Sequence, residues 1–308
     1  MKRVILTGGT GFVGANLSRR LLKEGHDLHL LLRPGYKPWR IEEIKNDAHL
    51  HTVDLVDAAV LNSVVERIRP DWVFHLAAYG AYPFQSDALA IMQTNIIGTI
   101  NLVEACLRAG FKAFVNTGTS SEYGFKDHAP PETESLEPNS GYALTKASAT
   151  LFCRYIAQSK KVHLSTLRLY SAYGPHEEST RLIPTLIRHG LKDELPPLVS
   201  PDTAHDYVYV EDVVDAYLLA AAKPKQEPGA VYNVGTGIQI SLRKVVDVAR
   251  RVIGISTKPK WGSMPNRDWD TNVWVADNRK IRKTLGWQPR YSFEEGFRLT
   301  VEWFRQQK

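Results

Sequence analysis

The stretch RVILTGGTGFVGANLSRRLLKEG, residues 3–25, indicates the fold of this 308-residue chain. Its apolar run at residues 4–6 ends in glycines and is typical of a buried strand, whereas residues 11–25 have the spacing of an amphipathic helix. Glycines between a strand and a helix permit a tight turn and the close approach of a pyrophosphate, and the helix presents free N–H groups to it. The stretch therefore predicts a dinucleotide-binding unit.

The glycine positions match a phosphate-binding spacing. Gly9, Gly11 and Gly14 fit G-x-G-x-x-G, and Gly8 offers a second spacing. A tight turn without a ligand is the alternative, but this motif lies between a strand pattern and a helix pattern, as its mechanism requires. The residues expected to contact the cofactor here are Gly8, Gly11, Phe12 and Val13.

Strand and helix patterns alternate as far as residue 170. Further strands are expected at residues 26–35, 48–55, 71–78, 112–120 and 162–170, and helices at residues 58–70, 88–109 and 142–158. The alternation predicts an α/β fold, a Rossmann-like doubly wound parallel sheet, with residues 1–170 as the dinucleotide-binding domain. We expect residues 171–205 and 236–308 to form a smaller C-terminal substrate-binding lobe, with Trp287 in its core. Residues 206–235 should return to the first domain, through a strand and a helix at 205–221.

Composition narrows the class of protein. Hydrophobic residues make up 43% of the chain, and the net charge of +6 is spread without a dense basic block, so we expect no nucleic-acid partner. Cys106 and Cys153 lie in apolar segments and are predicted to be buried free thiols in a reducing, cytoplasmic compartment. We expect no signal peptide and no apolar run of membrane-spanning length. No metal site is expected, because no histidine or carboxylate cluster accompanies the cysteines.

The residue that ends the second strand selects the cofactor. An acid there would bind the ribose 2′-hydroxyl of NAD, but this chain has Arg33, which favours the 2′-phosphate of NADP(H). NAD with a surface arginine is the alternative, and Arg40 is a possible second contact. Asp54 and Leu55, at the end of the third strand, are placed at the adenine, although Asp54 would also suit a helix N-cap.

The fifth strand and the helix that follows offer proton-transfer chemistry. Thr119 ends the strand, and Tyr142 and Lys146 lie four residues apart, on one face of a helix. A cation there is expected to lower the phenol pKa, so that Tyr142 exchanges a proton with a sugar hydroxyl or ketone while Thr119 binds the same oxygen. A Y-x-x-x-K pair alone is common by chance. Its combination with a dinucleotide fold makes a non-catalytic binding protein the weaker interpretation.

The chain resembles the extended short-chain dehydrogenase/reductase family, the NAD(P)-dependent epimerases and dehydratases of nucleotide sugars. The resemblance covers nearly the whole length. Its motifs are TGGTGFVG, HLAA at 75–78, NIIGT at 95–99, TSSEYG, YALTK, LRLYSAYGP, HDYVYVEDV and VADNRKIRKTLGWQP. It implies that Thr119, Tyr142 and Lys146 are catalytic, that Ala77 borders the nicotinamide half of the cofactor, and that Arg267 holds the substrate diphosphate. It also implies a homodimer built on helices 88–109 and 141–158.

Departures from the family pattern bear on the reaction. Dehydratases of this family have an acid directly after the catalytic threonine or two residues later, whereas this chain has Ser120 and Ser121, with Glu122 shifted by one. In extended backbone that shift turns the side chain to the other face, which disfavours a 4,6-dehydratase. The NADP(H) preference and a partial resemblance to CDP-paratose synthase favour an NADPH-dependent 4-ketoreductase acting on a nucleotide-linked 4-keto-6-deoxyhexose. A 4-epimerase that retains its cofactor is the alternative.

Several residues are expected to line the substrate pocket. His205 stands where the family usually has an arginine, and Ser171 stands where it usually has an asparagine. Both substitutions leave the nucleotide base open. The other residues expected in the pocket are Tyr79, Tyr82, Ser120 and Ser121. For Tyr79, Tyr82 and Ser121, simple packing is the alternative.

Overall fold

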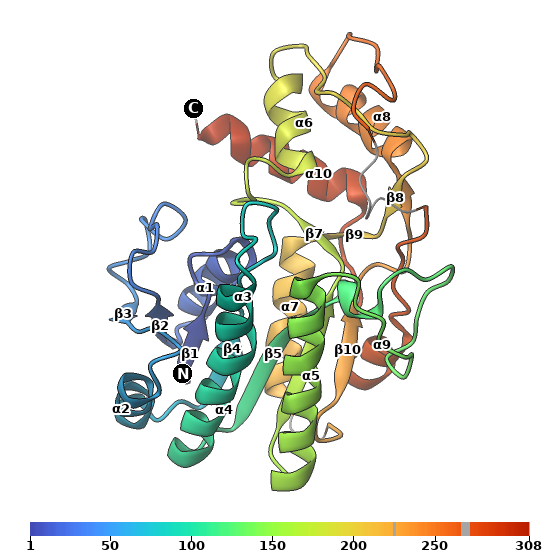
Figure 1. The fold of residues 1–308 in the computed structure, drawn as a ribbon. Coiled ribbons are helices and arrows are strands. Elements are labelled where there is room, and N and C mark those ends of the chain that lie inside the picture. The colour runs from blue at the N-terminus through green and yellow to red at the C-terminus, as the bar shows by residue number, and fades with distance from the viewer. Residues whose placement is uncertain (224–225, 266–271, 308) are drawn as a thin grey trace.

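The computed structural model describes residues 1–223, 226–265 and 272–307. Within them, seven parallel strands form one sheet in the order β10-β6-β5-β4-β1-β2-β3. The Rossmann-like α/β fold is confirmed, and Figure 1 shows the sheet beneath a second, smaller lobe. The strands are β1 (Arg3–Thr7), β2 (Asp27–Leu32), β3 (His49–Thr52), β4 (Trp72–His75), β5 (Ala113–Thr119), β6 (Leu164–Leu169) and β10 (Val231–Val234).

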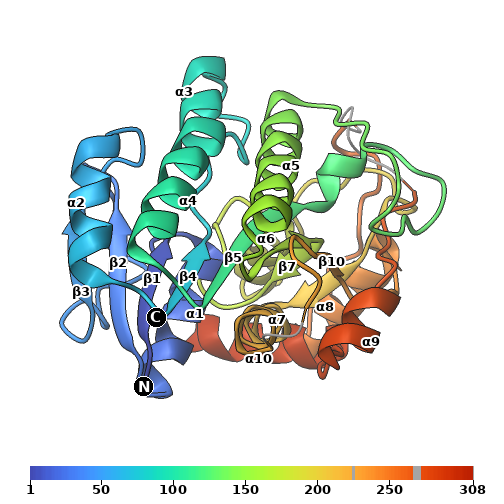
Figure 2. The same cartoon turned by 90° about the horizontal axis from the view of Figure 1, so that it is seen from below.

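Helices cover both faces of the sheet, as Figure 2 shows. On one face lie α1 (Phe12–Lys23), α7 (Val210–Ala222) and α9 (Arg279–Leu285), which share a core with β1, β2 and β5. On the other face lie α2 (Ala58–Ile68), α5 (Gly141–Lys160) and a continuous helix made of α3 (Ala88–Met92), a π-helical turn η1 (Gln93–Ile97) and α4 (Gly98–Ala109). The two layers bury the apolar side chains that alternate along the strands.

The chain order reverses at β1, whose two neighbours are β2 and β4. At such a reversal the loops that follow the two strands diverge and leave a crevice at the carboxyl ends. The glycine turn follows β1 and Ala77 follows β4, so two of the segments predicted to hold the cofactor meet at this crevice.

Backbone packing requires two glycines of the first turn. Gly8 has φ +74°, and a Cβ there would lie 2.5 Å from the carbonyl carbon of Leu76. A Cβ on Gly14 would lie 2.2 Å from the carbonyl oxygen of Gly8. No side chain fits at either position. Gly8 therefore packs against the backbone that follows β4, and α1 begins directly against Gly8.

The smaller lobe has its own core. Three helices build it, α6 (Leu182–Gly190), α8 (Leu242–Ile253) and α10 (Phe293–Gln306), with buried residues such as Leu186, Val245 and Phe297 between them. Two small sheets join it to the main body, β7 (Ser171–Tyr173) with β9 (Tyr207–Tyr209) and β8 (Ala204–His205) with β11 (Ile240–Ser241). The domain boundaries drawn from the sequence stay a prediction.

Residues 205–221 differ in part from the expectation. Their helix, α7, does pack on the main sheet, but their strand, Tyr207–Tyr209, pairs with Ser171–Tyr173 instead of joining it. The position beside β6 is taken by Val231–Val234. Trp287 is buried as predicted, but it packs in the core between α7 and the sheet, where its indole N–H donates to the carbonyl of Asp212 over 2.8 Å.

The helix Ala88–Ala109 corrects a second expectation. It has 22 residues and is apolar enough, by length and composition, to cross a membrane. Leu102, Val103 and Cys106 pack from it against the sheet, so these residues serve as one side of a core layer. Cys106 and Cys153 are buried and free, as predicted.

We expect Gly14→Ala to lower the free energy of unfolding by about 2 kcal/mol, because overpacking against fixed backbone typically costs 1–3 kcal/mol. Urea denaturation measures the effect. The matched control is Gly141→Ala, at the first residue of α5, where a new Cβ meets nothing within 4 Å. That variant should be neutral or slightly stabilised. Equal urea midpoints for the two variants would refute the packing argument.

Candidate active site

The amino terminus of α1 is open towards the crevice. Gly11 is its N-cap, and no side chain accepts hydrogen bonds from the first turn. The N–H groups of Phe12 and Val13 therefore lack intrahelical acceptors. A Cβ on Gly11 would meet only the carbonyl oxygen of Gly8, at 3.1 Å. The space outside this turn suits a phosphate, as predicted from the sequence, whereas the side chains of Phe12 and Val13 pack against the two cores.

A buried polar chain positions Ala77 beside the glycine turn. The backbone N–H of Ala77 donates to Thr7 Oγ1 over 3.2 Å, and that hydroxyl lies 2.7 Å from His75 Nδ1. The other ring nitrogen lies 2.8 Å from Thr99 Oγ1, and burial lowers the pKa of His75 to about 3. A neutral His75 thus links β1, β4 and α4 behind the crevice.

The two arginines that follow β2, Arg33 and Arg40, have different environments. Arg33 is exposed, and no side-chain contact of it is found among the described residues. Arg40 is buried, and its guanidinium donates to the carbonyls of His176 and Thr10 and to Glu178 over 2.7, 3.3 and 3.0 Å. Arg40 therefore ties the glycine turn to the smaller lobe, and Arg33 is the arginine that is free to meet a phosphate.

Asp54 and Leu55 lie after β3, near the start of α2. Asp54 is exposed and accepts only the nearby N–H of Val56, over 3.0 Å, while Leu55 is buried. The N-cap of α2 is Asp57, which accepts the N–H of Val60. The alternative role of Asp54 as a helix cap is therefore wrong, and its proposed place at the adenine stays a prediction.

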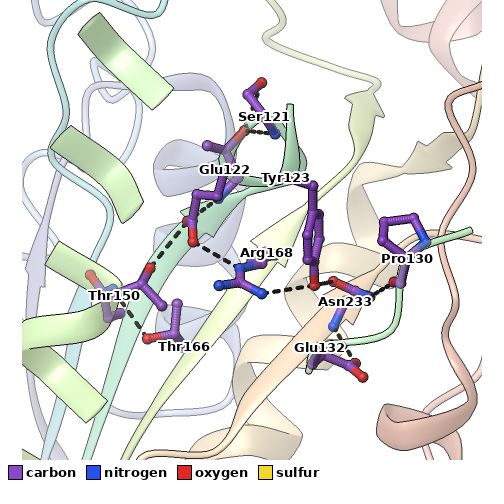
Figure 3. Close-up of polar contacts among 11 residues, drawn as sticks. Ser121, Glu122, Tyr123, Pro130, Glu132, Thr150, Thr166, Arg168 and Asn233 are labelled. Carbon is purple, nitrogen blue, oxygen red and sulfur yellow. Dashed lines mark hydrogen bonds and ion pairs between the residues drawn. The ribbon is translucent and has the colours of Figure 1, made fainter. Parts of the chain in front are cut away.

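A buried ion pair fixes the end of β5. Glu122 has no exposed surface and accepts hydrogen bonds from Arg168 Nε over 2.8 Å, from the N–H of Thr119 over 2.9 Å and from the Thr150 hydroxyl over 3.1 Å (Figure 3). Residues 120–123 form a short 3₁₀ helix, so the backbone is not extended as was expected from the sequence. Glu122 nevertheless points into the protein, away from the crevice.

The network continues from Arg168 to the edge of the sheet, as Figure 3 shows. Arg168 Nη1 donates to the hydroxyl of Tyr123, which donates to Asn233 Oδ1, both over 2.8 Å. The N–H of Asn233 donates to Glu132 over 2.9 Å. One chain of polar contacts therefore links β5, β6, β10 and the loop that precedes α5.

The predicted trio gathers around Glu122. The hydroxyl of Thr119 makes two long contacts, 3.3 Å each, with the N–H and the Oγ of Ser121, and it also accepts the N–H of Glu122 in a capping box. Tyr142 and Lys146 lie one turn apart on α5, and the charge of Glu122 acts on both. Ser120 is buried beside Thr119.

The expected lowering of the Tyr142 pKa is wrong for the protein alone. Burial, reinforced by the charge of Glu122, raises the pKa of Tyr142 to about 12. Burial also lowers the pKa of Lys146, and its Nζ is buried without a hydrogen-bond partner among the described residues. An ammonium in that position needs acceptors. Ribose hydroxyls of a dinucleotide would supply them, so the residues present fit the predicted cofactor.

Asn95 received no role from the sequence, although its motif was recognised there. Asn95 is fully buried in the π-helical turn, a feature frequent at functional sites. Its amide contacts the backbone N–H and carbonyl of Tyr79, over 2.9 and 2.8 Å, and donates to the Thr145 hydroxyl over 2.9 Å. Asn95 thereby holds the loop of Tyr79 against the helix that carries Lys146.

Two predicted substrate residues come together in the smaller lobe. Ser171 Oγ lies 3.4 Å from His205 Nδ1, and the His205 ring lies 6.1 Å from that of Trp274. Trp274 also packs on Tyr170, and these two rings line a small hollow with Ser120. This aromatic wall was not predicted from the sequence because Trp274 is distant in the chain. Arg267 lies outside the described residues.

Tyr82, Glu177 and Arg181 form a second group of side chains, and Glu177 and Arg181 belong to the segment that precedes α6. The guanidinium of Arg181 lies 5.6 Å from the ring centroid of Tyr82, and both residues act electrostatically on Tyr142. Glu177 is buried nearby, and burial raises its pKa to about 8. Tyr82, but not Arg181 or Glu177, was among the predicted pocket residues.

Comparisons with known proteins agree with this geometry. The chain matches the model of the NAD dependent epimerase/dehydratase family over residues 4–235. It is 28% identical to dTDP-D-glucose 4,6-dehydratase of Mus musculus, over 99% of this chain and 89% of the relative.

Two solved structures resemble the chain over almost its whole length. One is UDP-glucose 4-epimerase of Thermotoga maritima with UDP-glucose, with a TM-score of 0.89 and 28% identity over 99% of both chains. The other is UDP-glucose 4-epimerase of Thermus thermophilus in complex with NAD, with a TM-score of 0.85 and 29% identity over 98% of both chains.

We expect Arg168→Met to lower the free energy of unfolding by about 3–5 kcal/mol, because it leaves the Glu122 carboxylate buried without its partner. Urea denaturation checks this. The double variant Glu122→Gln/Arg168→Met should lose less than Arg168→Met alone. Arg243→Met is the control, since Arg243 is 55% exposed and its contact with Asp202 is 4.0 Å long. Equal losses in the single and double variants would contradict the role given to the buried charge.

Proposed function

The chain belongs to the NAD dependent epimerase/dehydratase family, and from this premise we propose that it is a nucleotide-sugar 4-epimerase that retains its nicotinamide cofactor. The observation that carries the proposal is the end of β5. Thr119, Tyr142 and Lys146 gather there, while the acid that follows Thr119, Glu122, is bound by Arg168 inside the protein. Dehydration would need an acid facing the sugar.

The comparisons support an epimerase better than the ketoreductase favoured by the sequence alone. The Thermotoga and Thermus structures, which match this chain end to end, are UDP-glucose 4-epimerases. The ketoreductase stays the second candidate because Arg33 is exposed at the end of β2, where a cation suits NADPH.

In the proposed reaction, the residues of the trio act on one sugar oxygen. A bound nicotinamide would supply the hydride chemistry at the sugar C4. Tyr142 takes the proton of the C4 hydroxyl and gives it back to the resulting ketone oxygen. Thr119 exchanges its weak contacts with Ser121 for a hydrogen bond to that oxygen, and Lys146 holds its charge beside the phenol.

The cofactor is proposed to lie across the crevice. Phe12 and Val13 would meet the pyrophosphate with their N–H groups, and Gly11, whose own N–H donates to the carbonyl of Gly8 over 2.9 Å, would let it approach the backbone closely. Ala77 would border the nicotinamide, and Lys146 would bind ribose hydroxyls. NADP(H) remains our proposal on the strength of Arg33, although the Thermus relative was solved with NAD. A cytoplasmic location likewise stays a prediction.

The sugar nucleotide is proposed to bind between Thr119 and the aromatic wall of Tyr170, Trp274 and His205. Aromatic rings stack on a nucleobase, and Ser120 lies between the wall and the trio. A UDP-sugar is favoured because the Thermotoga relative was solved with UDP-glucose.

A homodimer is also proposed. The helices α3 and α5 lie side by side in both ribbon views (Figures 1 and 2). Both helices also expose large apolar side chains. These are Leu89 and Met92 on α3 and Leu144, Leu151 and Tyr155 on α5, each more than half exposed. A second copy would cover them.

The proposed function predicts the behaviour of Tyr142→Phe. We expect this variant to lose at least about 10²-fold in turnover, because proton transfer by a positioned side chain is typically worth 10²–10⁴-fold. It should still bind NAD or NADP. The assay follows C4 interconversion of UDP-, CDP-, GDP- and dTDP-hexoses by chromatography, together with the cofactor released on denaturation. The control is Tyr291→Phe, at a partly buried tyrosine that packs against the core of the smaller lobe.

The outcomes separate the two candidates. Interconversion without net change in nicotinamide absorbance supports the epimerase. Stoichiometric NADPH loss with a 4-keto-6-deoxy sugar, and no interconversion, would establish the ketoreductase instead. Full activity of Tyr142→Phe in either assay would remove the catalytic role proposed for the trio.

The dimer predicts that Leu151→Glu shifts the protein to a monomer, because a charge is costly to bury in an apolar interface. Sedimentation velocity measures the change. Ile238→Glu, at a position that is 67% exposed outside these helices, should leave the dimer intact. A wild-type protein that sediments as a monomer would refute the proposal.

A further inference from the structure

Four metal-binding side chains gather on β2 and β3, apart from the active site. Asp27 and His29 are two residues apart on β2, so they share one face of the sheet, and His49 and His51 do the same on β3. The parallel register places His29 beside His49 and Leu31 beside His51. The D-x-H and H-x-H pairs were not recognised in the sequence because 19 residues separate them.

The distances between the ligand atoms suit one small cation. His29 Nε2 lies 3.4 Å from Asp27 Oδ2, and His49 Nε2 lies 3.3 Å from Asp27 Oδ1. All three ligand atoms lie within 4.8 Å of one another. A tetrahedral ion with bonds of 2.0–2.1 Å separates neighbouring ligands by about 3.3–3.4 Å. The Asp27 carboxylate already lies at that distance from both histidines, with Oδ2 towards His29 and Oδ1 towards His49.

His29 is prepared for this role by its other ring nitrogen. Its Nδ1 lies 3.0 Å from His51 Nε2, within hydrogen-bonding distance. If Nδ1 donates to His51, Nε2 carries a lone pair. That Nε2 is buried, has no well-formed hydrogen bond within the described residues and lies 3.4 Å from the Asp27 carboxylate. A lone pair that faces a carboxylate is unfavourable unless a cation lies between them. Metal-bound histidines commonly have such a partner at the second nitrogen.

From this geometry we propose that Asp27, His29 and His49 form a binding site for a divalent transition metal of the zinc class, with His51 as a positioning residue. Two imidazoles and one carboxylate suit zinc, whereas magnesium and calcium prefer oxygen ligands alone. Water would complete the tetrahedron, because the His49 side chain is 65% exposed. Arg3 and Arg67 act on the histidines from the neighbouring strand and helix, and Asp27 offsets this positive charge.

The site lies where it would stabilise the edge of the sheet. β3 has only four residues, pairs with β2 alone and is mostly exposed. A metal that joins His49 to Asp27 and His29 would fasten this strand to its neighbour. The glycine turn follows the carboxyl end of β1, whereas Ile5 in mid-strand pairs with His29. The metal is therefore independent of the proposed catalysis.

The test is isothermal titration of the full chain, stripped of metal by EDTA, with ZnCl₂. We expect one zinc ion per chain, and at least about 10-fold weaker binding in His49→Ala. His51→Gln should lose about 10- to 100-fold, as is typical when the hydrogen-bond partner of a metal-bound histidine is replaced. His49 is exposed, so its replacement should leave the fold intact, which circular dichroism checks. The control is His189→Ala, at a half-exposed histidine that lies beside one carboxylate.

A second measurement tests the strand directly. Zinc should slow hydrogen exchange of the β3 amides in the wild type but not in His49→Ala, and MgCl₂ should have no such effect. Absence of zinc binding, or equal binding by wild type and His49→Ala, would overturn the proposal. Equal protection by magnesium would overturn the assignment to the zinc class.

Discussion

The buried ion pair between Glu122 and Arg168 is the contact on which the geometry of the site depends. A carboxylate without exposed surface needs opposite charge and hydrogen bonds to be tolerated. Glu122 receives them from Arg168 on β6, from Thr150 on α5 and from the N–H of Thr119 at the end of β5. Because each donor belongs to a different element, satisfying one charge fixes three elements at once. Two of these elements, β5 and α5, carry the proposed catalytic groups.

The crevice itself shows the opposite arrangement, with polar groups that the protein leaves unsatisfied. In the part of the chain that the structure describes, Lys146 Nζ is buried without a hydrogen-bond partner, and the first turn of α1 has no side-chain cap. Each such group reduces stability, and a ligand with phosphates and hydroxyls would remove both penalties. The rigid network around Glu122 therefore holds open a set of donors that bind only when the cofactor arrives. The residues that stabilise this region, around Glu122, are thus different from the neighbouring residues proposed to bind the cofactor, which are Lys146 and the first turn of α1.

Local patterns predicted much of this, whereas partners distant in the chain could not be read from it. The glycine turn and the Tyr142–Lys146 pair follow from spacing along a single strand or helix. The partner of Glu122 is 46 residues away, and its direction depends on a 3₁₀ turn that looked like extended backbone. The edge strand Val231–Val234 took a place expected for Tyr207–Tyr209, because short apolar runs carry no information about pairing. The shift in the pKa of Tyr142 was predicted with the wrong sign, because burial and the charge of Glu122 outweigh the positive charge of Arg181.

The raised pKa of Tyr142 bears on the difference between a reductase and an epimerase. Burial and the charge of Glu122 keep Tyr142 protonated at neutral pH in the protein alone. A protonated phenol is ready to donate to a ketone, whereas removal of a proton from a hydroxyl needs the phenolate. Lys146 does not offset the burial, so the phenolate requires further positive charge beside it. A cofactor retained in its oxidised state would keep that charge in place for each turnover. Under the proposed function, the charge that fixes the geometry of the trio would thus also make epimerisation dependent on a retained cofactor.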